Sequence, residues 1–253
     1  MVAVTMTLFV LLKEKYKIME ILGKYQIENK DELYLDQRTD KMNIIKSISF
    51  NQQEIINNII ELHIPLKIIE VDVTFGRGLF YKNDKVKLPP FRYDIEPRTP
   101  GIVKCDCRNL PLKDSSINSL IMDPPFLATT GKSLKIDDES NKINKHFGVY
   151  PSEKELFQFY VDSLKEFYRV LKDKGILIFK IQDKVSGGKQ YFSHTFIQNE
   201  AEKIGFYSKD LFILLARNRI VADWQRKNQQ HARKHHCYFL VFQKIKCKVN
   251  YNL

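Results

Sequence analysis

The chain is poor in the residues that mark several classes of protein. Its 253 residues include four cysteines, ten glycines and nine prolines. The cysteines form no CxxC pair and follow no secretory signal, which argues against a disulfide scaffold. There is no excess of glycine or proline, no low-complexity tract and no internal repeat, so collagen-like, disordered and solenoid proteins are excluded.

Long hydrophobic runs are also missing. The apolar start, MVAVTMTLFVLL, has no basic leader and no small-residue cleavage site, and it is too short to span a bilayer. Its apolar positions recur at helical spacing and predict a packing helix over 5–23. We therefore expect a soluble, reduced, cytoplasmic protein with no membrane partner.

Basic residues outnumber acidic ones. The chain has 41 Lys and Arg against 30 Asp and Glu, which gives a formal net charge of +11. This balance suits a polyanionic partner such as nucleic acid, because each phosphate that is neutralised releases counterions. A basic enzyme from a lysine-rich proteome would carry the same charge, so charge alone leaves both interpretations open.

Apolar periodicity predicts strands that alternate with helices. Helices are expected at 51–63, 151–173 and 194–206, and strands at 67–74, 90–95, 101–106, 118–123, 175–182, 211–216 and 237–243. Such alternation is typical of a mostly parallel sheet with helices on both faces, and the late pair of strands predicts an antiparallel edge. We expect a helical extension over 1–44 and one α/β domain over 45–253, with a long loop at 127–150.

The first chemical motif is VDVTFGRG at residues 71–78. A strand that ends at Asp72 and runs into Gly76 and Gly78 makes a tight turn, in which the missing Cβ atoms let a ligand approach the backbone. A GxG after a strand is often only a turn. However, a carboxylate here repels a pyrophosphate and suits the ammonium of an amino-acid-like cofactor. The motif therefore favours S-adenosylmethionine over a dinucleotide.

Two further acidic residues follow the next strands. Asp94, with Glu96 as its rival, could accept hydrogen bonds from ribose hydroxyls, and Asp106 could accept from the amino group of an adenine. Each could equally be a plain loop carboxylate. Pro89 and Pro90 interrupt the segment before Asp94, so the first helix of the fold should be short or distorted.

The most specific motif is Asp123–Pro124–Pro125–Phe126, at the end of the predicted strand 118–123. An exocyclic amine of a base is a poor nucleophile, because its lone pair is delocalised into the ring. If the Asp123 carboxylate and the Pro124 carbonyl accept the hydrogens of the amine, its nitrogen is drawn toward tetrahedral geometry. Phe126 offers a face for stacking of an extruded base, and two prolines keep the carbonyl in place.

A basic segment lies between the last two predicted strands. Residues 217–236 contain one acid among six cations: Arg217, Arg219, Arg226, Lys227, Arg233 and Lys234. Basic and amide groups with Trp224 suit contacts to phosphates and base edges, although a solvated loop would look similar. The loop at 127–150, which carries four lysines, is a second candidate and could close over a flipped base.

Two smaller groups of residues leave their roles open. His231, His235, His236, Cys237 and Cys247 lack the spacing of a zinc finger, so we expect no metal. Lys180, Gln182 and Asp183 end the predicted strand 175–182. They could line a base pocket or simply begin a surface loop.

The order VDVTFGRG, YDIEP, CDCRNLP and NSLIMDPPF resembles the S-adenosylmethionine-dependent DNA amino-methyltransferases of bacteria and phages. Members of this N6-adenine and N4-cytosine family carry a (D/N/S)PP(Y/F/W) tetrapeptide. The resemblance implies a Rossmann-like class I methyltransferase fold with a seven-stranded sheet. It also implies cofactor contacts, made by Asp72, Thr74, Phe75, Gly76, Gly78, Asp94, Asp106 and Asp123. Residues Asp123 to Phe126 would hold the target base.

In this family an Asp at the first position of the tetrapeptide goes mostly with adenine N6, so the resemblance implies DNA adenine as the substrate. N4-cytosine of DNA and a base of RNA are the alternatives, the second because LPLKDSSINSLIMDPPF at 110–126 is also similar to the core of tRNA guanine-N2 enzymes. An inactive nucleic-acid-binding protein on the same fold is a rival from another class. The chain has no obvious separate target-recognition domain, and both a monomer and a homodimer remain open.

Overall fold

The computed structural model describes residues 44–82, 86–128, 150–217 and 229–245. The helix expected over 5–23 and most of the loop at 127–150 lie outside these ranges. The chain divides into two compact units, Met1–Ile45 and Lys46–Leu253. The architecture described below is that of the second unit.

Strands and helices alternate along this unit, as expected. The strands are β1 (Ile48–Ser49), β2 (Val71–Asp72), β3 (Phe91–Asp94), β4 (Val103–Lys104), β5 (Ile117–Met122), β6 (Leu171–Ile181), β7 (Lys184–Ser186), β8 (Lys189–Tyr191), β9 (Tyr207–Leu215) and β10 (His236–Gln243). The helices are α2 (Gln52–His63), the 3₁₀ turn η1 (Leu79–Tyr81), α4 (Glu153–Val170) and α5 (Ser193–Ile204).

The main sheet has eight strands in the order β1-β9-β10-β6-β5-β2-β3-β4. Every neighbouring pair is parallel except the two pairs that β10 makes, with β6 and with β9. Seven strands of this sheet remain when β1 is left out, and we number them one to seven along the chain, from β2 to β10. Their spatial order, starting at β4, is then 3-2-1-4-5-7-6. This is the Rossmann-like α/β fold of the class I methyltransferases, which confirms the expected fold class.

Two details of the sheet differ from the expectation. The antiparallel strand does not lie at an edge, because β10 is inserted between β6 and β9. Phe239 and Val241 on one face of β10 and Leu240 and Phe242 on the other are all buried, as expected for a strand inside the sheet that is covered on both faces. The eighth strand, β1, pairs with β9 through Ile48 and Ile213. Two residues carry no periodicity, so the sequence did not reveal it.

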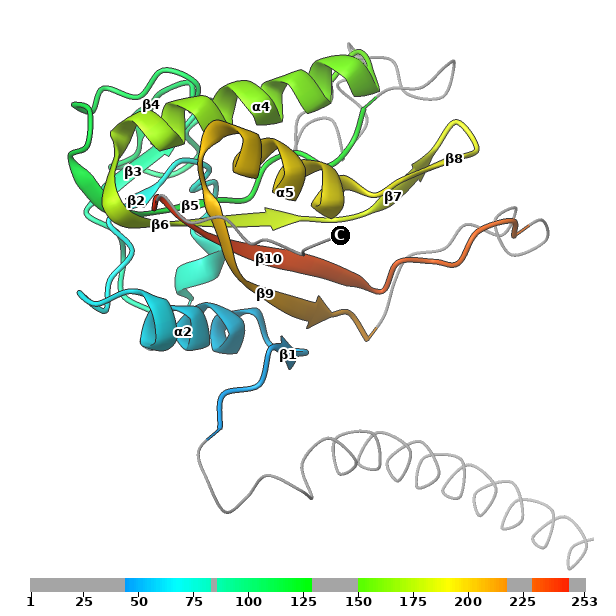
Figure 1. Cartoon of the computed structure of the whole chain (residues 1–253), viewed down its shortest axis with the longest axis horizontal. Helices are drawn as coiled ribbons and strands as arrows, with labels where there is room; N and C mark the ends of the chain where they lie inside the picture. Colours follow the sequence, from blue (N-terminus) through cyan, green and yellow to red (C-terminus); the bar gives the residue numbers. More distant parts are fainter. Residues whose placement is uncertain (1–43, 83–85, 129–149, 218–228, 246–253) are drawn as a thin grey trace, which may run out of the picture. The chain divides into compact units, whose positions relative to one another are not determined.

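Helices cover both faces of the sheet, α4 and α5 on one and α2 on the other (Figure 1). Helix α2 begins where the Asn51 side chain accepts hydrogen bonds from the N–H groups of Gln53 and Glu54. Its buried side chains are Ile55, Ile56, Ile59 and Ile60. Their spacing places one apolar stripe against the sheet, which explains the agreement between the predicted range 51–63 and the helix.

Helix α4 begins after Ser152, whose side chain caps the helix. The Ser152 hydroxyl oxygen accepts from the Glu155 N–H at 3.2 Å, and the hydroxyl donates to the Glu155 carboxylate at 3.1 Å. The helix ends at Val170, and β6 begins at once with Leu171. The sequence placed these boundaries at 173 and 175, because Lys174–Gly175 has the pattern of a helix end.

Between β2 and β3 the described residues form only the short turn η1, in place of the long first helix of a typical Rossmann-like unit. The prolines at 89 and 90 predicted this shortening. The segment from Asp72 to Tyr81 therefore stays close to the end of β2. In the described part of the chain, no helix is both long and apolar enough to cross a membrane.

Candidate active site

The carboxyl ends of β2 and β5 lie side by side and bring two predicted motifs together. Asp72 of β2 pairs with Ile121 of β5 in the parallel sheet. One residue past β5, the Asp123 N–H donates a hydrogen bond to the Thr74 hydroxyl at 2.7 Å. The loop at 72–78 and the tetrapeptide at 123–126 are therefore in direct contact.

The glycines of the loop have left-handed backbone conformations, with φ of 54° at Gly76 and 65° at Gly78. Residues other than glycine adopt this backbone conformation only at an energetic cost. A Cβ on Gly78 would also lie 2.9 Å from Cζ of Phe75. The Phe75 ring stacks on Tyr81 with centroids 5.5 Å apart. Gly78 is thus required both for the turn and for this stacking.

Asp72 is almost completely buried at the base of the loop. Its carboxylate accepts hydrogen bonds from the Thr74 N–H at 2.9 Å and from the Tyr81 hydroxyl at 2.8 Å. Burial, together with the negative charges of Asp123 and Asp94, raises the pKa of Asp72 from 3.8 to about 7, against the opposing effect of the two hydrogen bonds. Three carboxylates therefore meet at this edge of the sheet, and the charges of Asp94 and Asp123 both repel that of Asp72.

Asp94, at the end of β3, ties this strand to the glycine loop. Its carboxylate accepts from the Gly76 N–H at 2.8 Å and from the Glu96 N–H at 2.8 Å. Asp106 is held differently, because all hydrogen bonds to its carboxylate in the described residues come from Arg108. These bonds lower the pKa of Asp106.

Asp123 is paired with a lysine that the sequence left between two roles. The Lys180 ammonium donates to Asp123 Oδ2 at 2.7 Å and to Gln52 Oε1 at 3.0 Å. It also lies over the rings of Phe80 and Phe239, 5.2 and 5.7 Å from their centroids. The Lys180 side chain is 12% exposed. Lys180 thus faces the tetrapeptide and is not part of a surface loop.

The backbone carbonyls of the tetrapeptide differ in their partners. The Tyr160 hydroxyl donates to the Pro125 carbonyl at 2.6 Å, and the Lys184 ammonium donates to the Phe126 carbonyl at 2.7 Å. The Pro124 carbonyl accepts no hydrogen bond from the described residues, and neither does Asp123 Oδ1. Two adjacent acceptors are therefore left for a donor that comes from outside this part of the chain.

Lys184 is held next to the tetrapeptide by an ion pair with Glu153, in which Lys184 Nζ and Glu153 Oε2 are 2.7 Å apart. The two side chains are 10% and 11% exposed. Burial lowers the pKa of Lys184, although the negative charge of Glu153 opposes this effect. Tyr160 and Lys184 were missed by the sequence reasoning, because Tyr160 has the spacing of an apolar helix face and Lys184 stands in no motif.

The other two residues of the 180–183 group hold the backbone together. The Gln182 amide donates to the His236 carbonyl at 2.8 Å. Asp183 is 3% exposed and accepts from the N–H and the ring of His194, at 3.2 and 2.8 Å. Gln182 thus ties the end of β6 to the start of β10, and Asp183 ties it to the start of α5.

The structure places only part of the predicted nucleic-acid segment. Arg217 is exposed and its guanidinium lies 4.9 Å from the centroid of the Phe50 ring. The Ala216 N–H donates to the His235 carbonyl at 2.8 Å, so Arg217 lies near the segment before β10, which carries Arg233 and Lys234. Arg219, Arg226 and Lys227 lie outside the described residues.

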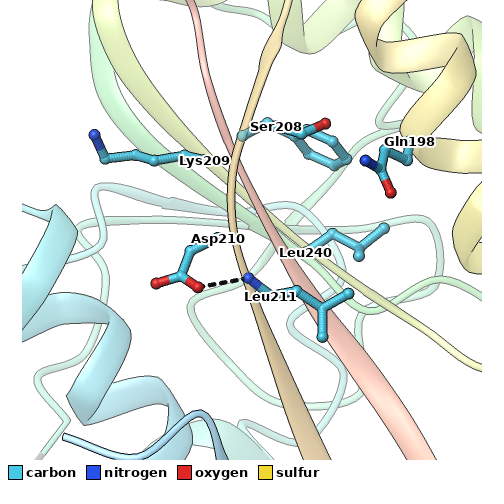
Figure 2. Close-up of a pocket in the computed structure, with 7 residues that line it drawn as sticks. Gln198, Ser208, Lys209, Asp210, Leu211 and Leu240 are labelled. Carbon is cyan, nitrogen blue, oxygen red and sulfur yellow. Dashed lines mark hydrogen bonds between the residues drawn. The ribbon is translucent and has the colours of Figure 1, made fainter. Parts of the chain in front are cut away.

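No group of three His, Cys, Asp or Glu side chains among the described residues is arranged to hold a metal ion. A cavity lies on the sheet between α5, β9 and β10 (Figure 2). Its lining residues are Gln198, Ser208, Lys209, Asp210, Leu211, Leu240 and Phe242. It shares no residue with the site at the carboxyl ends of β2 and β5, and we assign the site from the contacts there.

Comparison with known proteins gives no family model and no curated protein that matches the chain. Among solved structures, a protein of Thermus thermophilus, named provisionally as a DNA modification methylase and solved with S-adenosyl-L-methionine, is 16% identical. The match covers 57% of this chain and 55% of that one, with a TM-score of 0.36.

Two other solved structures are similarly distant. TrmN from Thermus thermophilus is 11% identical over 76% of this chain and 49% of its own, with a TM-score of 0.43. The PvuII DNA methyltransferase, which is specific for cytosine N4, is 13% identical over 54% of this chain and 45% of its own, with a TM-score of 0.35. The chain thus spans about half the length of these structures.

Proposed function

We propose that this chain is an S-adenosylmethionine-dependent methyltransferase that methylates an exocyclic amine of a DNA base, with adenine N6 as the first target. The observation that carries the proposal is the hydrogen bond of 2.7 Å between the Asp123 N–H and the Thr74 hydroxyl. It joins a loop suited to the methyl donor and a tetrapeptide suited to the acceptor nitrogen, the two components that such a transfer must hold together. The proposed catalytic domain covers 45–253, with 1–44 as an extension.

The charge at this edge of the sheet fits the cofactor. Burial raises the pKa of Asp72, and the nearby negative charges of Asp123 and Asp94 add a smaller rise in the same direction. A ligand that carries a sulfonium and an ammonium would relieve this repulsion, whereas a pyrophosphate would increase it. When bound, S-adenosylmethionine supplies an electrophilic methyl group. The residues proposed to hold it are Asp72, Thr74, Phe75, Gly76, Gly78, Asp94, Asp106 and Asp123.

The tetrapeptide would act mainly by positioning and electrostatics. Asp123 Oδ1 and the Pro124 carbonyl would accept the two hydrogens of the base amine, while Lys180 stays hydrogen-bonded to Asp123 Oδ2. The nitrogen would then approach tetrahedral geometry, and its lone pair would form the new N–C bond as the bond between the methyl group and the cofactor sulfur breaks. S-adenosylhomocysteine would be the leaving group, and the methylated amine would lose one proton to solvent through its acceptor Asp123 Oδ1. Hydrogen bonds to the carbonyls of Pro125 and Phe126 keep the loop in place.

Nucleic acid is the proposed partner because of the net charge of +11 and the cations of the segment 217–236. The contacts would come from Arg217, Arg219, Arg226, Lys227, Arg233 and Lys234. Cytosine N4 is the alternative on DNA. A base of RNA is the second candidate function, since the same pair of acceptors would bind any exocyclic amine.

The direct test is methyl transfer from labelled S-adenosylmethionine to duplex DNA and to tRNA, followed by analysis of the product nucleosides. We expect label in DNA, as N6-methyladenine. Label in N4-methylcytosine or in tRNA would replace the proposed substrate and keep the reaction. Cofactor binding without transfer to either polymer would instead favour an inactive binding protein on this fold.

A further inference from the structure

A two-stranded ribbon projects from the end of β6 at the side of the candidate active site. Strands β7 and β8 pair antiparallel, with Lys184 opposite Tyr191 and Ser186 opposite Lys189. Gly187 and Gly188 join them with φ of 54° and 73°, which is the pattern of a tight type I′ turn. A Cβ on Gly188 would meet nothing within 4 Å. The side of Gly188 on which a Cβ would lie is therefore open, and the ribbon projects beyond the end of β6 (Figure 1).

The base of the ribbon is fixed to the tetrapeptide. Lys184, its first residue, donates to the Phe126 carbonyl and forms the buried ion pair with Glu153. Tyr191, its last residue, lies with its ring centroid 5.9 Å from that of Phe157 on α4. Because both ends pack on elements that hold the site, the position of the ribbon is coupled to the position of Phe126.

The ribbon and the segment beside it carry charge of one sign. Residues 184–192 contain two lysines and no acid, and residues 229–243 contain Arg233 and Lys234 and no acid. The ring of His231 lies 3.2 Å from the Gly188 carbonyl, so this second segment runs against the tip of the ribbon. Lys189 is exposed, and Arg233 Nε is buried with no hydrogen-bond partner in the described residues. Lys189 is therefore available to a polyanion, whereas Lys184 is already paired with Glu153 and Arg233 Nε is not exposed.

We infer that the ribbon 184–191 enters the major groove of duplex DNA while 229–235 follows the adjacent phosphates. The major groove of B-DNA is about 12 Å wide and admits a two-stranded ribbon, whereas the major groove of an RNA duplex is too narrow for side chains to read. The small glycine tip suits such an insertion. This inference deepens the proposed function, on which it rests, because it names the element that would bring the substrate to Asp123.

The test measures binding of a fluorescein-labelled DNA duplex of mixed sequence, and of the matching RNA duplex, by anisotropy at several salt concentrations. The variant is Lys189→Glu in the full chain. The matched control is Lys165→Glu on α4, where the lysine side chain is 61% exposed. We expect Lys189→Glu to weaken DNA binding by about tenfold and to lower the salt slope by about 1, with little change in the control.

The inference would be overturned if both variants bound DNA alike, or if the wild-type chain preferred the RNA duplex. Methyl transfer measured on the same preparations separates this result from the proposed function. A chain that methylates DNA but does not depend on Lys189 contradicts only the role of the ribbon. A chain that binds DNA through Lys189 but transfers no methyl group contradicts only the proposed reaction.

Discussion

The acids of the glycine loop and the acid of the tetrapeptide lie at the same edge of the sheet, but their carboxylates are used differently. Asp72 and Asp94 each accept two hydrogen bonds, and three of the four donors are Thr74, Gly76 and Tyr81 in or next to the glycine loop. Asp123 accepts one, from Lys180, and the Pro124 carbonyl beside it has no partner among the described residues. Asp72 and Asp94 therefore shape the glycine loop, whereas Asp123 retains one oxygen, Oδ1, that can accept a hydrogen bond from a ligand.

This difference teaches that acidic residues in one site can be distinguished by which of their oxygens are already hydrogen-bonded. An acid whose oxygens are already engaged contributes through loop geometry and local charge. An acid with a free oxygen beside a free carbonyl can bind a donor directly. The predictions below test whether the two groups respond differently to substitution.

The largest effect is expected for Asp123→Ala, which removes the free acceptor. We expect kcat for methyl transfer to fall by about 10²- to 10³-fold, because one preorganised interaction at the reacting group is lost. Cofactor affinity, measured by calorimetry, should fall much less than kcat, because seven other residues are proposed to hold the cofactor. Asp162→Ala, on the exposed side of α4, is the control and should keep full activity. Equal activity of both variants would contradict the role of Asp123.

Asp72, whose oxygens are both hydrogen-bonded, should instead affect how the stability of the fold depends on pH. Burial raises the pKa of Asp72 from 3.8 to about 7, so between these values the folded chain holds a proton that the unfolded chain releases. The stability that this proton contributes is complete below about pH 4 and is lost as the pH rises toward about 7. Relative to Asp72→Asn, wild type should lose on the order of 3 kcal/mol across this window. Urea unfolding at both ends of the window measures the difference, and parallel curves for the two proteins would refute it.

A smaller loss of stability is expected when the glycine turn at 76–78 is altered. Gly78→Ala adds a Cβ at positive φ that would lie 2.9 Å from the Phe75 ring, whereas Gly188→Ala meets open space at a similar φ. We expect about 1 kcal/mol of destabilisation for Gly188→Ala and about 1–3 kcal/mol more for Gly78→Ala. Thermal unfolding of the two variants gives the comparison. A smaller loss for Gly78→Ala would mean that the loop rearranges freely.

The smallest effect is expected for Lys180, which acts through Asp123. Lys180→Met removes the ammonium from Asp123 Oδ2 and should lower kcat about tenfold, with little change in cofactor affinity. Lys180→Arg keeps the charge and should recover part of the rate. If methionine and arginine reduced kcat equally, Lys180 would support only the packing between Phe80 and Phe239.

The order of the elements could be predicted from the sequence, because each helix and strand has its own apolar period. The helix at Gln52–His63 and the strand at Ile117–Met122 match the predicted ranges to within about one residue. The position of β10 inside the sheet could not be predicted, because the order of strands along the chain does not fix their order in space. The ribbon at 184–191 was missed although Gly187–Gly188 between two short runs is a known hairpin pattern.

For the site, the motifs could be predicted and their partners could not. VDVTFGRG and DPPF lie next to each other because strands β2 and β5 are neighbours, which the fold class already implied. The contact between Asp123 and Lys180 depends on the register of two parallel strands, in which Met122 pairs with Phe179. No turn links these strands and sets that register, so the sequence alone left Lys180 without a role.

The central claim is that Asp123 Oδ1 and the Pro124 carbonyl hold the target amine beside a cofactor on the Gly76–Gly78 turn. A crystal structure with S-adenosylhomocysteine and a DNA duplex tests it most directly. We predict an extruded base whose exocyclic nitrogen lies within hydrogen-bond distance of both acceptors, with the cofactor sulfur next to it. A cofactor bound away from the turn, or a base amine held by other residues, would contradict the claim.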